Sequence, residues 1–123
     1  MSPQDRFTLR LEEVGRQDVA RVGGKNASLG EMIAQLGDVG IRVPGGFVTT
    51  ADAYRRFLAD NDLEERIRAE IGNLKPDQKN LAAVGKAVRK LIGAGTMPAN
   101  LAEQIRQSYA EMARDGQPAT VAV

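Results

Sequence analysis

Apolar residues at helical spacing run through most of this chain, and they restrict it to a helix-rich fold. Strand-like patterns are short, with apolar and polar residues alternating over 7–12 and a β-prone run at 46–49. We therefore predict an α+β fold, a helix-rich lobe with a few short strands. The apolar residues recur three and four positions apart in segments separated by glycine and proline, at residues 29–36, 53–71, 81–92 and 101–112.

The first predicted helix follows residues 15–22, which we expect to form a loop. The helix can begin at Lys25, or at Ser28 if Ser28 and Glu31 form a capping box of the S-x-x-E type. Both starts leave Lys25 near the N-terminus of the helix. The apolar face of this helix is expected to consist of Leu29, Met32, Ile33 and Leu36.

Glycines and capping residues predict the other boundaries. Gly37 and Gly40 are expected to end the first helix through left-handed caps. Thr50 is expected to cap the first of two short helices over 51–72, and Asp62 with Glu65 the second. Further helices are expected over 81–92, ended by Gly93 and Gly95, and from about Pro98 onward.

The last five residues, Ala-Thr-Val-Ala-Val at 119–123, form a β-prone apolar run with no polar tail. We expect a strand here that continues beyond Val123. The sequence would then be a fragment of a longer domain.

The Gly23-Gly24-Lys25 sequence at the start of the first helix suits a phosphate. Paired glycines let a backbone approach a ligand, the first turn of a helix has unpaired N–H groups, and Lys25 adds a positive charge. Two simpler interpretations are a steric connector and a solvated lysine, although the helix dipole makes a lysine mildly unfavourable at this position. Gly23, Gly24 and Lys25 are the candidate phosphate-binding residues.

Better-known phosphate and metal motifs do not match the sequence. A Walker A motif has a glycine five positions before its Gly-Lys pair and a serine or threonine after it, but this chain has Val19 and Asn26 there. No G-x-G-x-x-G sequence follows either expected strand. The acidic residues within 60–65 lack the spacing of an EF-hand and favour a solvated helix junction. We assign no metal ligand and no catalytic residue.

Composition narrows the function further. The 17 basic and 16 acidic residues are well mixed, so the net charge of +1 does not favour nucleic acid or an anionic membrane as a partner. The 123 residues contain no histidine and no cysteine. The lack of cysteine excludes a disulfide framework and a thiolate site, and any role of histidine as metal ligand, general base or phosphoryl carrier would belong to another segment or chain.

No targeting or membrane-spanning segment is predicted. The N-terminal residues lack the apolar run of a signal peptide, and no stretch reaches the roughly 18 consecutive apolar residues of a transmembrane helix. We therefore expect a cytoplasmic location.

Three segments carry a resemblance to a known family: RVGGKNASLGEM at residues 21–32, VPGGFVTTADAYRRFL at 43–58 and TVAV at 120–123. Together they resemble the N-terminus of the phosphoenolpyruvate synthase family. The pattern GGK-x-A-x-L-x-E-M followed by VP-x-GF-x-TT is similar to the nucleotide-binding domain that this family shares with pyruvate phosphate dikinase and rifampicin phosphotransferase. Asn26 and the TTADAY segment favour the synthases.

The resemblance implies an ATP-grasp domain of which residues 1–123 form the N-terminal lobe, truncated at its C-terminal edge. In the family the lysine that matches Lys25 contacts the ATP phosphates, and Gly23 and Gly24 would let the loop approach them. The TVAV strand continues in relatives into an Arg-Ser-Ser segment whose arginine also serves the nucleotide. Mg²⁺ would be required, with ligands outside these residues.

The implied reaction converts pyruvate, ATP and water into phosphoenolpyruvate, AMP and phosphate through a phosphohistidine on another domain. The partners would be ATP, pyruvate and the remaining domains of the same polypeptide. The resemblance is compatible with an oligomer, and we expect neither nucleic acid nor a membrane as a partner. The fragment alone is expected to be inactive.

Two alternatives stay open. One is a pyruvate phosphate dikinase or a rifampicin phosphotransferase-like enzyme, because these use the same nucleotide domain with a different acceptor. The other is a stand-alone helical interaction module that binds a partner through apolar helix faces.

Overall fold

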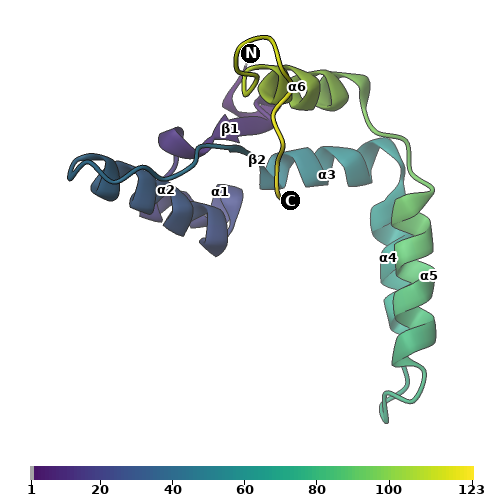
Figure 1. Ribbon diagram of the computed structural model, residues 1–123. Helices are drawn as coiled ribbons and strands as arrows, with labels where there is room; N and C mark the ends of the chain where they lie inside the picture. The colour runs from purple at the N-terminus through teal and green to yellow at the C-terminus, as the bar shows by residue number, and fades with distance from the viewer. Residues whose placement is uncertain (1) are drawn as a thin grey trace. The chain divides into compact units, whose positions relative to one another are not determined.

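The computed structural model describes residues 2–123, which divide into two compact units, residues 2–54 with 99–123 and residues 55–98. The helix-rich content with a small sheet confirms the predicted α+β class. In chain order the elements are η1 (Pro3–Asp5), β1 (Thr8–Arg10), η2 (Leu11–Glu13), η3 (Arg16–Asp18), α1 (Val19–Val22), α2 (Gly24–Gly37), β2 (Phe47–Thr49), α3 (Ala51–Asp60), α4 (Leu63–Gly72), α5 (Leu81–Gly93) and α6 (Ala99–Ala110), where η denotes a 3₁₀ turn (Figure 1).

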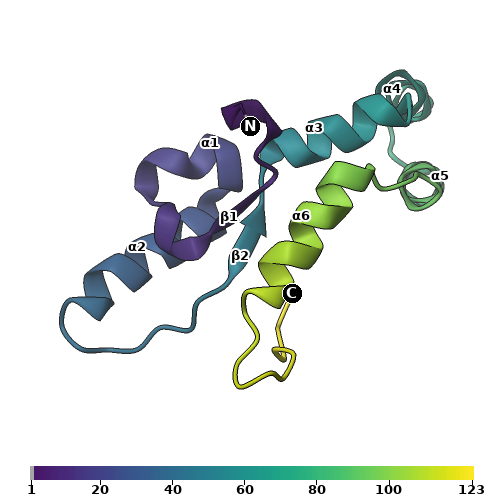
Figure 2. The ribbon, with the colours of Figure 1, turned by 90° about the horizontal axis from the view of Figure 1, so that it is seen from above.

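A two-stranded antiparallel sheet lies at the centre of the first unit. Strand β1 pairs with β2, with Leu9 opposite Val48. Because side chains alternate across a strand, Leu9 and Thr8 point to opposite faces of the sheet. Helix α2 covers the Leu9 face and α6 covers the Thr8 face, as the two views show (Figures 1 and 2).

The apolar core of the first unit lies between the sheet and α2. Leu29 and Ile33 of α2 pack against it, as predicted, but Met32 is 45% exposed and contributes little. Ala27 and Gly30 are the buried positions of α2 instead. Because Ala27 and Gly30 have small side chains or none, α2 lies closer to its neighbours than it could with the larger residues of the predicted apolar face. The buried members of this core are Leu9, Leu11, Val14, Val22, Ala27 and Val48.

Polar contacts attach α6 to the other face of the sheet. The hydroxyl of Ser108 donates to the hydroxyl of Thr8 at 2.8 Å. The side chain of Gln104 accepts the N–H of Phe7 at 2.7 Å and donates to the carbonyl of Asp5 at 2.8 Å. Residues nearly a hundred positions apart are thereby joined, so the C-terminal helix belongs to the same unit as the N-terminal strand.

The second unit contains the end of α3 and the pair α4 and α5, which contact each other along their length (Figure 1). Leu63 is 1% exposed and Val84 is also buried. Asn61 fixes the base of the unit, because its side-chain amide accepts the N–H of Thr96 at 2.7 Å and donates to the carbonyl of Thr96 at 2.9 Å. The two short helices predicted over 51–72 and the helix predicted over 81–92 are confirmed.

Residues 15–22 do not form the predicted loop, because η3 and α1 occupy most of this segment. The side chain of Asp18 accepts the N–H of Gly15 at 3.0 Å, and the Asp18 N–H donates to the Gly15 carbonyl at 2.9 Å. These two bonds close a turn from which α1 starts. Strand β1 is also shorter than predicted, since the chain turns into η2 at Leu11.

Two predicted caps are wrong. Asp62 adopts a left-handed backbone with φ of 52° and makes no side-chain capping bond, because a cap requires the extended backbone that the turn between α3 and α4 does not permit. Gly40 is left-handed as predicted, with φ of 80°, but Gly37 is the last residue of α2 and does not have a positive φ. Thr50 caps α3 as predicted, by accepting the Ala53 N–H at 3.2 Å.

The predicted C-terminal strand is not formed. Residues 118–123 have no regular structure, and Val121 is 42% exposed. A strand needs a neighbour to accept and donate its backbone hydrogen bonds, and no strand within residues 2–123 pairs with this run. No helix in the described part of the chain combines the length and apolarity needed to cross a membrane.

Candidate functional site

Gly23 forms the junction between α1 and α2. Its backbone has φ of 81° and ψ of 162°, a region that glycine alone adopts readily. Its N–H ends α1 by donating to the carbonyl of Val19 at 2.8 Å, and its carbonyl begins α2 by accepting the N–H of Ala27 at 3.1 Å. A glycine is therefore required here by the fold alone.

The first turn of α2 presents three backbone N–H groups that have no acceptor within the helix. They belong to Gly24, Lys25 and Asn26, which precede the first intrahelical bond, donated by Ala27. The helix therefore begins one residue before Lys25 and not at Ser28. Lys25 is exposed, pairs with no carboxylate among residues 2–123, and shares the first turn with no acidic residue.

Gly24 has open space around it. A Cβ added at Gly24 would meet no atom within 4 Å, and its backbone is helical. A hollow of about 350 Å³ begins beside Gly24 and continues along α2, where Arg16, Ser28 and Glu31 also line it. The structure thus brings Gly23, Gly24 and Lys25 together at one exposed helix start, with room for a ligand to approach the backbone.

Gly30 holds α2 against the preceding turns, a role that was not assigned from the sequence. A Cβ at Gly30 would lie 2.0 Å from the carbonyl oxygen of Val14 and 2.8 Å from that of Leu11. The signal in the sequence was a glycine on the buried side of a helix, where alanine has the higher helix propensity. Gly30 sets how closely α2 approaches η2, and therefore where the start of α2 lies.

Glu31 also positions α2, in place of the capping box that the sequence suggests. One carboxylate oxygen of Glu31 accepts the N–H of Arg16 at 2.8 Å, and the other accepts the side-chain amide of Gln35 at 3.1 Å. Because α2 starts before Ser28, Ser28 lies inside the helix and has no cap to form. Glu31 instead connects α2 to η3, the turn that leads into α1.

Glu13 strengthens the turn on which Gly30 rests. The guanidinium of Arg6 donates a hydrogen bond to Glu13 and lowers the pKa of this carboxyl group, while partial burial acts in the opposite direction. The Arg10 N–H also donates to Glu13, at 2.8 Å, and lowers the pKa further. The ionised carboxylate thus closes η2, the turn that contacts α2.

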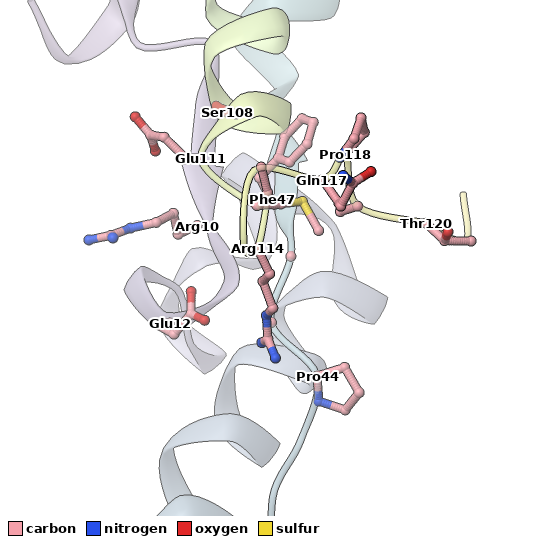
Figure 3. A pocket seen from close by; sticks show the side chains of 15 residues that line it. Arg10, Glu12, Pro44, Phe47, Ser108, Glu111, Arg114, Gln117, Pro118 and Thr120 are labelled. Atoms are coloured by element: carbon pink, nitrogen blue, oxygen red, sulfur yellow. The ribbon is translucent and has the colours of Figure 1, made fainter.

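A concavity of about 860 Å³ lies elsewhere, on the α6 face of the sheet. Figure 3 shows the residues around it, among them Arg10, Glu12 and Phe47 from the strands and η2, and Glu111 and Arg114 from the segment after α6. Neither glycine of the predicted site nor Lys25 lines it. The candidate phosphate site is therefore an open helix start, separate from this concavity, and α2 packs on the opposite face of the sheet.

No three acidic side chains within residues 2–123 gather closely enough to hold a metal ion. Three of the acidic residues within 60–65, namely Asp60, Glu64 and Glu65, pair with arginines. Asp60 pairs with Arg56 at 2.8 Å and Glu64 pairs with Arg68 at 3.0 Å. These pairs lie on exposed helix surfaces and form the kind of charged junction that solvent stabilises.

Comparison with known proteins gives the family. Residues 19–123 match the family described as pyruvate phosphate dikinase, AMP/ATP-binding domain. The phosphoenolpyruvate synthase of Neisseria meningitidis serogroup B is 48% identical over 120 residues, which are 97% of this chain and 15% of that protein. The phosphoenolpyruvate synthases of Pseudomonas aeruginosa and Escherichia coli K12 are 45% and 41% identical over 118 residues, which are 95% of this chain and 15% of each protein.

The chain thus spans about 15% of the length of these curated relatives, with their names describing much longer proteins. The matched residues include the junction at Gly23, the whole of α2 and both strand β2 and helix α6. The chain belongs to the family of pyruvate phosphate dikinase AMP/ATP-binding domains.

Proposed function

We propose that this chain is the N-terminal lobe of the ATP-grasp nucleotide-binding domain of a phosphoenolpyruvate synthase, in which Gly23, Gly24 and Lys25 bind the phosphates of ATP. The observation that carries the proposal is the start of α2. Three backbone N–H groups without helical acceptors lie there together with an exposed lysine that pairs with no carboxylate within residues 2–123, in a member of an AMP/ATP-binding family.

The chemistry of this helix start fits a polyphosphate. Backbone N–H groups donate hydrogen bonds to phosphate oxygens, and the positive end of the helix dipole favours an anion. Lys25 is unfavourable beside that same positive end when nothing is bound. A phosphate between the lysine and the amides would reverse this repulsion, so an otherwise costly placement becomes an advantage.

The residues of this chain would bind and orient the ATP phosphates. Phosphoryl transfer depends mainly on positioning and on neutralising charge, and both are within reach of amides and a lysine on one lobe. Mg²⁺ would neutralise further phosphate charge. We expect its ligands outside these residues, since no group of three or more acidic side chains gathers within residues 2–123.

The whole enzyme would convert pyruvate, ATP and water into phosphoenolpyruvate, AMP and phosphate in the cytoplasm, with a histidine on another domain of the same polypeptide as phosphate carrier. The names of the relatives support the synthase over a dikinase or an antibiotic phosphotransferase. They also do not favour a stand-alone helical interaction module.

Lys25→Ala in a full-length enzyme containing this sequence tests the proposal. We expect ATP-dependent formation of phosphoenolpyruvate to fall about 100-fold or more, as when a preorganised charge-stabilising group is removed. Lys86→Ala is the matched control, because Lys86 is also an exposed helical lysine but lies on α5. Wild-type turnover in the Lys25→Ala variant, or an equal loss in the control, would contradict the proposal.

A further inference from the structure

Asn26 is the third residue of α2, and its side chain turns back to the preceding helix. We propose that Asn26 is a positioning residue for the phosphate site, because it fastens the end of α1 to the start of α2 and covers a carbonyl oxygen that would otherwise face the bound anion. This inference rests on the proposed function of Gly23, Gly24 and Lys25.

The side-chain amide of Asn26 donates a hydrogen bond to the carbonyl oxygen of Val22 at 2.8 Å. This bond spans both glycines of the junction. The backbone N–H of Asn26 is meanwhile one of the three amides without a helical acceptor. The backbone N–H of Asn26 is therefore available to the phosphate, while its side chain holds the junction that orients this N–H.

The junction needs such a fastening. Nothing lies within 4 Å of a Cβ position at either Gly23 or Gly24, so side-chain packing does not restrain the two residues with the greatest backbone freedom. The three amides can bind one phosphate group together only if the junction keeps one conformation. A hydrogen bond across it reduces the entropy lost on binding, which is the usual benefit of preorganisation.

The Val22 carbonyl gives Asn26 a second, electrostatic role. Val22 is 6% exposed and ends α1, so its carbonyl has no acceptor role within that helix. A carbonyl oxygen carries partial negative charge and repels an anion at the neighbouring helix start. Donation from Asn26 satisfies this buried carbonyl and weakens the repulsion.

Asn61 provides a matched control. Its side-chain amide donates to the carbonyl four residues earlier, that of Phe57, at 2.8 Å, which reproduces the Asn26 geometry in the second unit. Asn61 also bonds both backbone groups of Thr96. Asn61→Ala should therefore lower thermal stability at least as much as Asn26→Ala while leaving ATP binding unchanged.

The experiment compares Asn26→Ala, Asn26→Asp, Asn61→Ala and Lys25→Ala in a full-length enzyme containing this sequence, by KM for ATP, kcat and melting temperature. We expect Asn26→Ala to raise the KM for ATP about 3- to 10-fold, the effect of losing one hydrogen bond. Asn26→Asp should raise it about 10- to 100-fold, because the carboxylate cannot donate to Val22 and adds a negative charge beside the phosphates.

Comparing the KM for ATP with the melting temperature separates positioning from mere stability. A purely structural role predicts that both Asn26 variants lower the melting temperature, as Asn61→Ala does, and leave the KM for ATP unchanged, because neither alanine nor aspartate can donate to the Val22 carbonyl. An unchanged KM for ATP in both Asn26 variants, with Lys25→Ala still inactive, would overturn this inference and leave the proposed function standing. Full activity of Lys25→Ala would overturn both.

Discussion

The start and the middle of α2 each contain a glycine, and the two glycines differ in what surrounds them. At Gly30 an added Cβ would lie 2.0 Å from the Val14 carbonyl oxygen, whereas at Gly24 it would meet nothing within 4 Å. Both residues are in the same helix and both have ordinary helical backbones. Packing thus explains why residue 30 is a glycine but does not explain why residue 24 is one.

This difference indicates which part of α2 serves the fold and which part is available to a ligand. The middle is held by the backbone of the preceding turns and by Glu31, which binds the Arg16 N–H. The start projects from that support with its amides and Lys25 uncommitted. A supported middle and an open start are what a rigid anion-binding helix requires.

Gly30→Ala should have the largest effect on stability. The new methyl group would overlap backbone atoms that cannot rotate away, so α2 must shift from η2, at a cost of about 3 kcal/mol. Urea denaturation of the 123-residue chain measures this cost, with Gly37→Ala in the same helix as the control. A loss below about 1 kcal/mol would mean that the middle of α2 is less tightly supported than the contacts indicate.

Gly23→Ala should have the next largest effect. Its cost is backbone strain alone, since no atom lies near the Cβ position and the φ of 81° is unfavourable for any other residue. We expect a loss of about 2 kcal/mol in the same denaturation experiment. Stability equal to wild type would show that the junction adopts another conformation without penalty.

Glu13→Gln should have a smaller, pH-dependent effect. The folded state lowers the pKa of Glu13, so its contribution to stability is present above the unfolded pKa of about 4.3 and is lost as the pH falls through the lower folded value. The side chain is 28% exposed, which limits the contribution to less than about 1 kcal/mol.

Denaturation at several pH values checks this prediction. The wild type should exceed Glu13→Gln in stability at pH 7, and the gap should close below about pH 4. A gap that stays constant down to pH 3 would show that the charge of Glu13 does not support η2.

Apolar periodicity predicted the helices well because the residues that form the buried face of a helix lie only three or four positions apart in the sequence. The apolar spacing placed α3, α4 and α5 correctly, and Thr50 was recognised as a cap because its hydroxyl acts on a residue three positions away. Lys25 was likewise placed at the start of α2 from the glycines before it. Its role in binding phosphate stays a prediction.

Features that depend on distant parts of the chain could not be predicted. The importance of Gly30 comes from the carbonyl groups of Leu11 and Val14. The sequence shows a glycine inside a helix but does not indicate which groups lie against it. The 119–123 run has strand propensity, but propensity forms no strand where a pairing partner is missing from the described residues. The spacing of Ser28 and Glu31 indicated a capping box, but the Glu31 carboxylate accepts the N–H of Arg16 instead.

Gly24→Ala has the smallest expected effect on stability, and for that reason it tests the binding site most directly. Because its Cβ would point into open space on a helical backbone, we expect unchanged or slightly increased stability, by up to about 1 kcal/mol. Gly37→Ala is again the matched control, being helical and unobstructed at the other end of α2.

The decisive measurement is the dissociation constant of ATP, obtained by calorimetry, for both variants of a full-length enzyme containing this sequence. If the phosphates approach the backbone at the start of α2, a methyl group at Gly24 obstructs them, and Gly24→Ala should bind ATP at least about 10-fold more weakly than wild type while Gly37→Ala binds normally. Equal affinity in Gly24→Ala, Gly37→Ala and wild type would contradict the assignment of the ATP phosphates to this helix start.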